Sequence, residues 1–520
     1  MTMMITPFLF LLFLLPYASF SHTLRGLFID CGATVAYKIN GLEWLPDAGY
    51  ISSGTSKNVE APVFFPTTIA SLRTFPLKGN VFKKFCYEIP VDRRTKKYLI
   101  RTTFYYGGVN GNADPPVFDL IVDGTMWSVV NTTADYVMGN LSSYEGVFMP
   151  TGKNLSVCLS ANAYTDSDPF ISALEVVPLW DQLYNSIDFR YYSLNLVARH
   201  SFGHNGPMIG YPDDQFNRYW EPYGGNSVFQ STSANVSVAG IWNLPPSKVF
   251  QTGLVKSLAD QPLELLWPPS PLPLPIRYYY IALYFADIDQ TSFSGSSRML
   301  DVTINGVTHI NNLNVIPAGV AVFVNKWPLA GLTNLTLSPS PGSSVGPVIN
   351  AAEAFEVLQN GGKTLSRDAI AMINLRSSFQ NPPDDWHGDP CLPPQYSWTG
   401  VTCSLGQNRI RVVTLNLTNM GLLGSLSPNI SSLTALTSIL LQNNSLSGSI
   451  PDLSSLRRLQ FLHLEDNLLG GTIPTSMGNL TNLSELFLQN NNLTGKVPSN
   501  LVGKPGLTLR YTPGNPFLIP

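Results

Sequence analysis

The sequence predicts a mostly β protein in which two tandem β-sandwiches precede a short solenoid of strand-containing repeats with an α-helical N-terminal cap. Three observations predict this fold class. A pattern of 23 or 24 residues recurs four times near the C-terminus. Residues 97–124 match residues 279–306, and 41 Gly, 41 Pro and 11% aromatic residues favour short strands and turns. At about 100–200 residues per domain, 520 residues accommodate about three such units.

The charge balance excludes one class of partner. The chain carries 31 Lys and Arg against 34 Asp and Glu, which gives a formal net charge of -3. A nucleic-acid-binding protein needs a large basic surface that displaces counterions from phosphate. We therefore expect no nucleic-acid partner.

The N-terminus has the pattern of a signal peptide over residues 1–21. A short apolar run, residues 8–17, is followed by small residues at Ala18, Ser19 and Ser21. This run is shorter than the roughly 20 residues that a membrane helix needs, and five prolines interrupt the apolar stretch 263–276. Residues 511–520, expected to form a tail, lack the pattern of a GPI signal. We expect a secreted mature chain without a membrane span.

Potential N-glycosylation sites agree with secretion. Eleven asparagines stand in Asn-x-Ser/Thr with no Pro between, and each one that is modified marks an exposed surface. They are Asn131, Asn140, Asn154, Asn235, Asn334, Asn416, Asn429, Asn443, Asn479, Asn482 and Asn492.

The matching segments predict two related sandwiches, over residues 25–180 and 190–358. Each segment has an aromatic-rich strand, a variable loop and a hairpin signal, Asp123-Gly124 in the first and Asn305-Gly306 in the second. Each half also closes on a similar motif, residues 169–175 and 347–353. The shared offset of about 180 residues indicates two homologous β-rich units in tandem.

A cap is predicted over residues 363–405. Residues 365–379 have the pattern of an amphipathic helix with Ser366 as a potential N-cap. A disulfide between Cys391 and Cys403 would close the loop that follows. The alternative, a metal held by His387 and both cysteines, lacks a fourth ligand, so we expect neither a metal nor a cofactor.

The repeats predict a solenoid over residues 410–510. The pattern L-x-x-L-x-L-x-x-N-x-L-x-G-x-I-P starts at Val412, Leu436, Leu459 and Leu483, and it resembles the plant-type extracellular leucine-rich repeat. Asn444, Asn467 and Asn491 occupy the position where a side-chain amide can satisfy backbone groups at the turn.

Several motifs together resemble the ectodomain of plant malectin-like leucine-rich-repeat receptor kinases. The motifs are Phe28-Ile-Asp-Cys-Gly32, Cys86-Tyr-Glu-Ile-Pro90, Tyr98-Leu-Ile-Arg101, Phe170-Ile-Ser-Ala-Leu-Glu175 and Trp386-His-Gly-Asp-Pro-Cys391. The resemblance covers residues 25 to about 515 and implies two malectin-like sandwiches, a cap and a solenoid. Because Ile519 and Pro520 follow Gly514-Asn-Pro-Phe-Leu518, we expect a receptor-like protein without the membrane helix and kinase.

Resemblance to malectin implies a carbohydrate site at Tyr50, Phe75 and Asp168, since malectin holds a diglucose unit with aromatic rings and an aspartate. Stacking rings and hydroxyl acceptors suit sugars in general. The aromatic pair that malectin carries after one strand is absent, because Gly108 and Val109 stand there in the first unit. Any sugar affinity is therefore expected to be weak. Tyr105, Tyr106, Tyr279 and Tyr280 are interpreted as strand core.

The solenoid predicts a protein-binding surface. Side chains that alternate with the buried leucines face the concave side, where apolar and acidic groups suit a peptide or protein partner. The expected binding residues are Leu440, Phe461, His463, Glu465, Glu485 and Phe487. The alternative is that they are structural spacers, because isolated exposed apolar residues are common.

No catalytic constellation emerges from the sequence, so we expect no enzyme. His200 and His204 lack the helix and the glutamate of a zinc protease motif, and the carboxylate pairs are adjacent rather than placed across a cleft. Among the remaining cysteines the pattern favours a Cys86–Cys158 bond with Cys31 buried and free, although spacing alone leaves the pairing open.

The combined prediction is a secreted receptor-like binding protein of the apoplast or cell wall. Its malectin-like tandem would contact cell-wall carbohydrate, and its repeats would contact an extracellular protein, such as a receptor kinase ectodomain that ties it to the plasma membrane. The competing hypothesis is a protein-only scaffold or decoy without carbohydrate binding.

Overall fold

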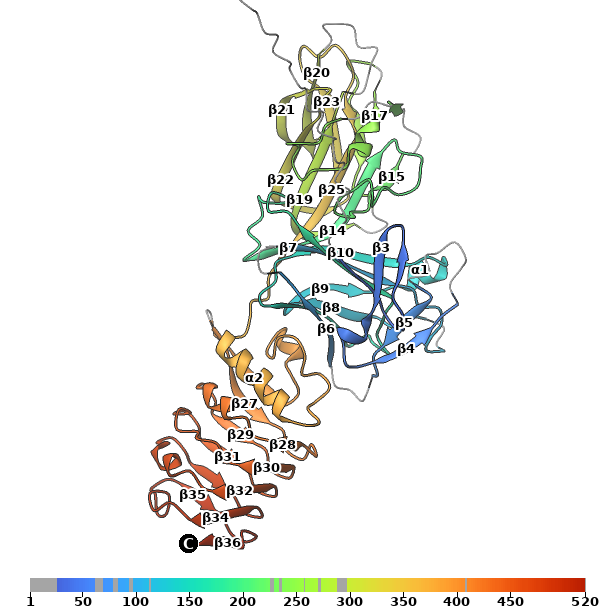
Figure 1. Ribbon diagram of the computed structural model, residues 1–520. Coiled ribbons are helices and arrows are strands. Elements are labelled where there is room, and N and C mark those ends of the chain that lie inside the picture. The colour runs from blue at the N-terminus through green and yellow to red at the C-terminus, as the bar shows by residue number, and fades with distance from the viewer. Residues whose placement is uncertain are drawn as a thin grey trace, which may run out of the picture.

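Along the chain, two β-sandwiches are followed by the cap and then by a repeat solenoid. In space the first sandwich lies in the middle, with the second sandwich on one side and the cap and solenoid on the other (Figure 1). The computed structural model describes residues 26–519 except 61–68, 78–82, 93–96, 112–113, 225–228, 233–235, 257, 270–272, 288–296 and 407–408. The predicted signal peptide, residues 1–21, and the sequon at Asn235 lie outside the described residues.

The first sandwich packs two main sheets around an aromatic core. One sheet has the order β2 (Tyr37–Ile39), β3 (Leu42–Pro46), β1 (Leu27–Asp30), β13 (Ala173–Leu179), β7 (Lys97–Phe104), β10 (Ser142–Phe148). The other has the order β6 (Lys84–Pro90), β11 (Asn154–Ala161), β8 (Phe118–Val122), β9 (Thr125–Val130). A small third sheet holds β12 (Phe170–Ile171), β5 (Ser71–Thr74) and β4 (Thr55–Asn58), and α1 spans Thr133–Val137.

The second sandwich repeats this strand order, which explains the matching segments of the sequence. Its first sheet holds β14 (Tyr192–Phe202), β25 (Ala351–Gln359), β19 (Leu274–Phe285) and β22 (Val320–Gly331), with β15 (Glu221–Tyr223) beside β14. Its second holds β18 (Leu263–Leu266), β23 (Asn334–Pro339), β20 (Arg298–Ile304) and β21 (Val307–Val315). Its small sheet holds β16 (Phe229–Ser231), β17 (Thr252–Val255) and β24 (Val348–Ile349).

The predicted hairpins form between β8 and β9 and between β20 and β21. Asp123 and Gly124 have φ of 45° and 79°, and Asn305 and Gly306 have φ of 49° and 79°. Two consecutive positive φ values are what a type I′ hairpin turn requires, and Asp, Asn and Gly tolerate them best. Tyr279 and Tyr280, interpreted from the sequence as core, are buried in β19.

The two sandwiches share one continuous 11-stranded sheet, because β10 of the first pairs with β14 of the second. Gly146 faces Asn195 and Val147 faces Leu194 at this seam. A Cβ at Gly146 would lie 2.8 Å from the carbonyl oxygen of Leu194 and 2.6 Å from the ring of Phe148. Only glycine therefore permits this close approach of the two strands.

The cap helix, α2, spans Ser366–Ser378. The prediction that Ser366 is the N-cap is wrong: Leu365 holds that position, and its side chain makes no capping bond. Asp368 in the first turn instead accepts hydrogen bonds from Arg411 Nε at 2.7 Å and from the backbone N–H of Val412 at 3.2 Å. These bonds tie the helix to the first solenoid strand.

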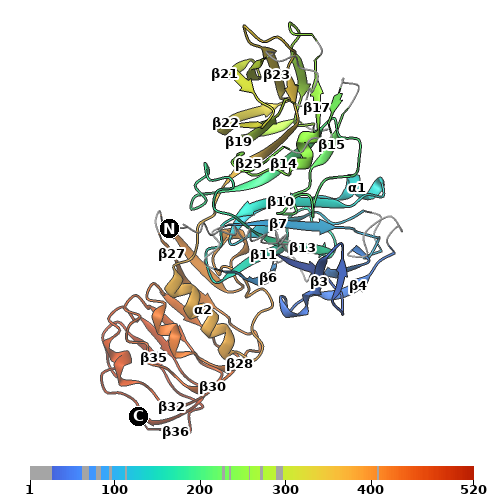
Figure 2. The same cartoon turned by 45° about the horizontal axis from the view of Figure 1, so that its top comes forward.

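The solenoid carries two ladders of short strands (Figure 2). The first ladder is β26 (Val401–Gly406), β27 (Arg409–Asn416), β29 (Ser438–Leu440), β31 (Phe461–His463), β33 (Glu485–Phe487), β35 (Thr508–Arg510). The second is β28 (Leu423–Ser425), β30 (Ser445–Ser449), β32 (Leu468–Thr472), β34 (Asn492–Lys496), β36 (Phe517–Ile519). One hydrophobic core runs from α2 through every repeat to Leu501.

The predicted asparagine positions satisfy backbone groups as expected. The amide nitrogen of Asn467 donates to the carbonyls of Leu441 and Leu464, while its oxygen accepts from the N–H of Leu446. Asn515 repeats this role, since it donates to the carbonyl of Leu488. Residues 511–520, expected to be a tail, therefore contain part of a fifth rung.

The first sandwich is fastened to the cap by buried polar contacts. The ammonium of Lys84, on β6, donates to the carbonyls of Asp389 and Leu392. Glu88 accepts from the N–H of Gly388 at 2.9 Å, and the hydroxyl of Tyr396 donates to Asp119. Burial lowers the pKa of Lys84 to about 8. A charge placed in this way depends on the cap carbonyls that receive it.

Both predicted disulfides are present. Cys86 and Cys158 face each other on β6 and β11 and are bonded, and Cys391 is bonded to Cys403 in the cap. Cys31 is buried and free, as the sequence favours. The two cap cysteines are therefore bonded to each other.

Candidate functional site

The predicted carbohydrate residues of the first sandwich do not form an open platform. Phe75 is fully buried, and its ring stacks on Phe85 with centroids 5.1 Å apart. A ring in this position has no face for a sugar. The expectation for Phe75 is thus corrected: it is a core residue, because a phenylalanine has no hydroxyl that would favour exposure.

Asp168 and Tyr50 are half-buried. One carboxylate oxygen of Asp168 accepts from the N–H of Leu77 at 2.9 Å, and its backbone carbonyl accepts from the amide of Asn110. Tyr50 packs against the aromatic core. Asp168 therefore connects the loops of Leu77 and Asn110 through hydrogen bonds. The neighbouring residue Val109 also packs against the core.

A cleft with a volume of about 800 Å³ lies between the two sandwiches. Its floor is the shared sheet, where β13, β7, β10 and β14 run side by side. One wall is the β2–β3 hairpin of the first sandwich, and the other is the loop around residues 208–221 of the second. The ring of Tyr211 lies 3.9 Å from where a Cβ of Gly41 would be, so the walls meet at the rim.

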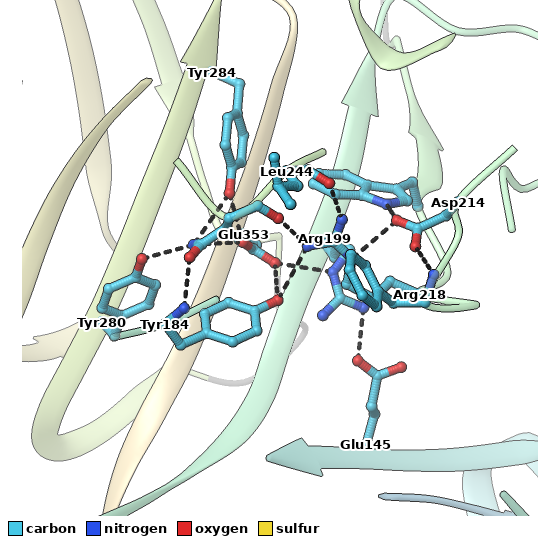
Figure 3. Close-up of polar contacts among 12 residues, drawn as sticks. Glu145, Tyr184, Arg199, Asp214, Arg218, Leu244, Tyr280, Tyr284 and Glu353 are labelled. Carbon is cyan, nitrogen blue, oxygen red and sulfur yellow. Dashed lines mark hydrogen bonds and ion pairs between the residues drawn. The ribbon is translucent and has the colours of Figure 1, made fainter. Parts of the chain in front are cut away.

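Buried charges bridge the seam beneath this cleft. Arg199 of β14 contacts Glu145 of β10 at 2.7 Å and Glu353 of β25 at 3.0 Å (Figure 3). Arg101 of β7 contacts Glu145 at 2.6 Å and Glu175 of β13 at 2.8 Å. The Arg199–Glu145 pair thereby joins both sandwiches through side chains as well as through backbone pairing, and Arg101 contacts Glu145 from within the first sandwich.

The charge states of this network follow from its contacts. Burial opposes the charge of Glu145, but Arg199 and Arg101 hold its pKa below the ordinary value. Burial raises the pKa of Glu175 above its ordinary value, even though Arg101 opposes this shift. Burial also lowers the pKa of His200, at the cleft, to about 4, so this imidazole is neutral at physiological pH. His200 Nδ1 accepts from the indole N–H of Trp267 at 3.1 Å.

The concave face of the solenoid presents side chains in columns, because equivalent strand residues stack from rung to rung. One column runs Ser438, Phe461, Glu485, Thr508. The next runs Leu440, His463, Phe487, Arg510. The six residues predicted from the sequence therefore lie together on neighbouring rungs, and we call them the concave patch: Leu440, Phe461, His463, Glu465, Glu485 and Phe487.

Contacts within the concave patch fix its central rings. His463 Nε2 lies 2.8 Å from Glu485, and its ring stacks on Phe487 at 4.4 Å. The guanidinium of Arg510 lies over the ring of Phe487, 4.7 Å from its centroid. Arg510 was not among the predicted residues, because the sequence pattern did not identify the fifth rung. Burial raises the pKa of Glu465. Its Oε2 is buried without a hydrogen-bond partner, as are single oxygens of Gln442 and Gln489.

The potential glycosylation sites are all exposed where they are described, ten asparagines in total. Asn416 lies on β27, at the first rung of the concave face. A glycan there would cover the N-terminal end of this face, next to Leu440 of the concave patch. Glycosylation at any of these positions remains a prediction.

Over the described ranges, no group of three or more His, Cys, Asp or Glu side chains is placed to hold a metal ion. Within the same ranges, no helix has the length and apolar character needed to cross a bilayer.

Tandem sandwiches joined to a capped leucine-rich-repeat solenoid define the ectodomain class of receptor-like proteins. A family model described as the malectin-like domain matches residues 29–357, a leucine-rich-repeat N-terminal domain matches 365–404, and leucine-rich repeats match 458–480 and 482–503. The chain therefore belongs to the malectin-like family, within a leucine-rich-repeat receptor-like architecture.

Curated relatives support this assignment. A leucine-rich repeat receptor-like serine/threonine-protein kinase of Arabidopsis thaliana is 32% identical over 424 residues, which cover 78% of this chain and 47% of the relative. The probable kinase PAM74 of the same plant is 29% identical, with 78% and 46% covered. The chain thus spans about half the length of the curated relatives it matches.

Solved structures share the fold at low identity. The plant receptor-like kinase FER matches with a TM-score of 0.53 and 16% identity, covering 65% of this chain and 97% of that one. A complex of the plant peptide RALF23 with FER and LLG2 matches with a TM-score of 0.51 and 16% identity, covering 65% and 96%. At this identity the similarity establishes the fold alone.

Proposed function

We propose that the chain is a non-enzymatic extracellular recognition module whose concave patch binds a peptide or protein segment. The observation that carries this proposal is the grouping of half-exposed rings, Phe461 and Phe487, with Leu440 and a His463–Glu485 pair on adjacent rungs. Aromatic anchors surrounded by oriented polar groups are the usual centre of a protein interface.

The polar part of the concave patch favours a partner that donates hydrogen bonds. Three buried acceptor oxygens follow one another along the rungs without a partner: Oε2 of Glu465 in the concave patch, and the amide oxygens of Gln442 and Gln489 on the neighbouring rungs. Buried acceptors normally have one. Because these oxygens are buried, backbone N–H groups or a basic side chain of a partner would supply the missing donors after the three side chains rotate toward it.

The related receptor FER supports peptide recognition within this fold, since it forms a complex with RALF23 and LLG2. For this chain we infer the apoplast or cell wall as location. The partner would be an extracellular protein, such as the ectodomain of a receptor kinase at the plasma membrane.

The test is a display screen of peptides against the glycosylated protein, followed by affinity measurements with any peptide selected. Phe487→Ala should weaken binding by about 30-fold, the effect of losing a central interface residue. Phe517→Ala is the matched control, because this ring is 63% exposed on the second ladder of the same solenoid. Equal affinities of both variants would contradict the proposal.

A second proposed activity is binding of cell-wall carbohydrate by the tandem sandwiches. The inter-sandwich cleft favours it, because its volume of about 800 Å³ lies within the range of ligand pockets, about 300–1,000 Å³. A glycan array with the intact protein separates this hypothesis from a protein-only scaffold, which would bind no oligosaccharide.

A further inference from the structure

We propose that the cleft between the two sandwiches is the carbohydrate site and that it selects neutral oligosaccharides over acidic ones. The proposal rests on the carbohydrate activity inferred above and adds to it a location and a ligand class. It also places the site away from Tyr50, Phe75 and Asp168, where the malectin resemblance puts it.

The shape of the cleft suits a ligand that touches both sandwiches. The floor belongs to both, because β10 and β14 are hydrogen-bonded neighbours. Leu42 comes from the hairpin of the first sandwich, while Met208 and Tyr211 come from the loop of the second. Pockets of this kind occur preferentially at domain interfaces.

The apolar groups of the cleft offer surfaces for the C–H faces of sugar rings. Met208 is 45% exposed, and Leu42, Leu196 and Tyr211 are half-buried. Tyr219 is fixed in place, because its ring lies 3.4 Å from the guanidinium of Arg101. Rings held by such contacts lose little conformational freedom when a ligand binds.

The accessible charges of the cleft are carboxylates. Glu221 at the rim has a side chain that is 66% exposed, and Asp135 on α1 is half-buried. The cations that line the cleft, Arg101 and Arg199, are buried and already paired with Glu145, Glu175 and Glu353. Carboxylates accept hydrogen bonds from the hydroxyl groups of sugars but repel the negative charge of a uronate.

Neutral hydrogen-bonding groups complete the lining. Asn40 and Ser143 are exposed on opposite parts of the cleft, one in the hairpin turn and one on β10. Together with Glu221 they supply both acceptors and donors. A neutral oligosaccharide presents the matching hydroxyl groups, each of which can donate and accept.

The experiment uses the intact glycosylated protein and isothermal titration with cello-, xylo- and manno-oligosaccharides, with oligogalacturonides as the acidic comparison. Tyr211→Ala and Glu221→Gln should each weaken binding of the neutral ligand by about 10-fold, the effect of losing one good contact. Ser143→Trp should abolish binding by filling the floor. Tyr164→Ala is the matched control, because this ring is 79% exposed elsewhere on the first sandwich. Circular dichroism and the thermal midpoint verify that each variant folds.

Three results would overturn the proposal. If neutral oligosaccharides bind but the cleft variants leave the affinity unchanged, the location is wrong while the carbohydrate activity stands. If oligogalacturonides bind more tightly, the ligand class is wrong. If no oligosaccharide binds to the folded protein, both the site and the carbohydrate activity are refuted, and peptide binding at the concave patch is unaffected.

Discussion

Replacing Arg199 with methionine tests whether buried charges hold the two sandwiches together. The change keeps most of the apolar volume and removes the cation between Glu145 and Glu353. Breaking a buried ion pair from one side costs about 3–5 kcal/mol, because the remaining carboxylate is left without compensation.

The remaining contacts place the expected loss at the lower end of that range. Glu145 keeps Arg101 at 2.6 Å. Glu353 still accepts from the hydroxyls of Tyr284 at 2.6 Å and Tyr184 at 3.0 Å (Figure 3). We therefore expect Arg199→Met to lower the free energy of unfolding of the tandem by about 3 kcal/mol.

Thermal unfolding combined with hydrogen exchange measures this effect and locates it. Exchange should accelerate first at the seam, around Gly146 and Asn195. Arg190→Met is the matched control, because the Arg190 side chain is 73% exposed, and it should leave the midpoint unchanged. Adding Glu353→Gln to Arg199→Met should recover part of the loss, since it removes the uncompensated charge. A loss below about 1 kcal/mol would refute the assigned role of the network.

Three other expected outcomes concern different parts of the chain. Burial raises the pKa of Asp30 to about 6, so between about pH 4 and 6 the folded state binds a proton that the unfolded chain does not. Stability relative to Asp30→Asn should therefore fall as pH rises through this window, by up to about 3 kcal/mol in denaturant titrations; a pH-independent difference would contradict this. Cys391→Ala should destabilise the repeat domain by about 3 kcal/mol, because it removes the disulfide of the cap. Peptide mapping of the unmodified protein that finds both thiols free would contradict this expectation. Lys84→Met should lower the free energy of unfolding by about 1–3 kcal/mol, because it leaves the carbonyls of Asp389 and Leu392 unpaired. If hydrogen exchange in this variant accelerates only outside the cap, the contact between the first sandwich and the cap does not have the assigned role.

Periodic and local features were predictable from the sequence. The solenoid core and the role of Asn467 follow from a repeat in which each unit meets the same environment. The hairpin at Asp123 and Gly124 follows from two neighbouring residues that tolerate positive φ. The tandem of sandwiches follows from an internal match of strands and turns. Each of these signals lies within one short window or recurs at a fixed interval.

The inter-sandwich features depend on long-range contacts and were not predictable in this way. Arg199 contacts Glu145 across 54 residues and Glu353 across 154, and no local pattern identifies such partners. The shared sheet depends on the close approach at Gly146, which looks like an ordinary strand glycine in the sequence. Phe75 was misplaced because its burial depends on packing against Phe85, a contact that the sequence around Phe75 does not show. The fifth rung was missed because only Asn515 of its pattern is clear.

The ionised seam itself needs a physical reason, because apolar residues of similar volume would hold two sheets together at least as well as buried ion pairs. Charges add a directional requirement: Arg199 of β14 reaches Glu145 of β10 only when the two strands have this register. They also leave Glu145 and Glu175 along the floor of the cleft and Asn217 on its wall. A floor of leucine would fix neither the register nor a polar surface. The network therefore explains both how the sandwiches are oriented and why the space between them has a polar floor.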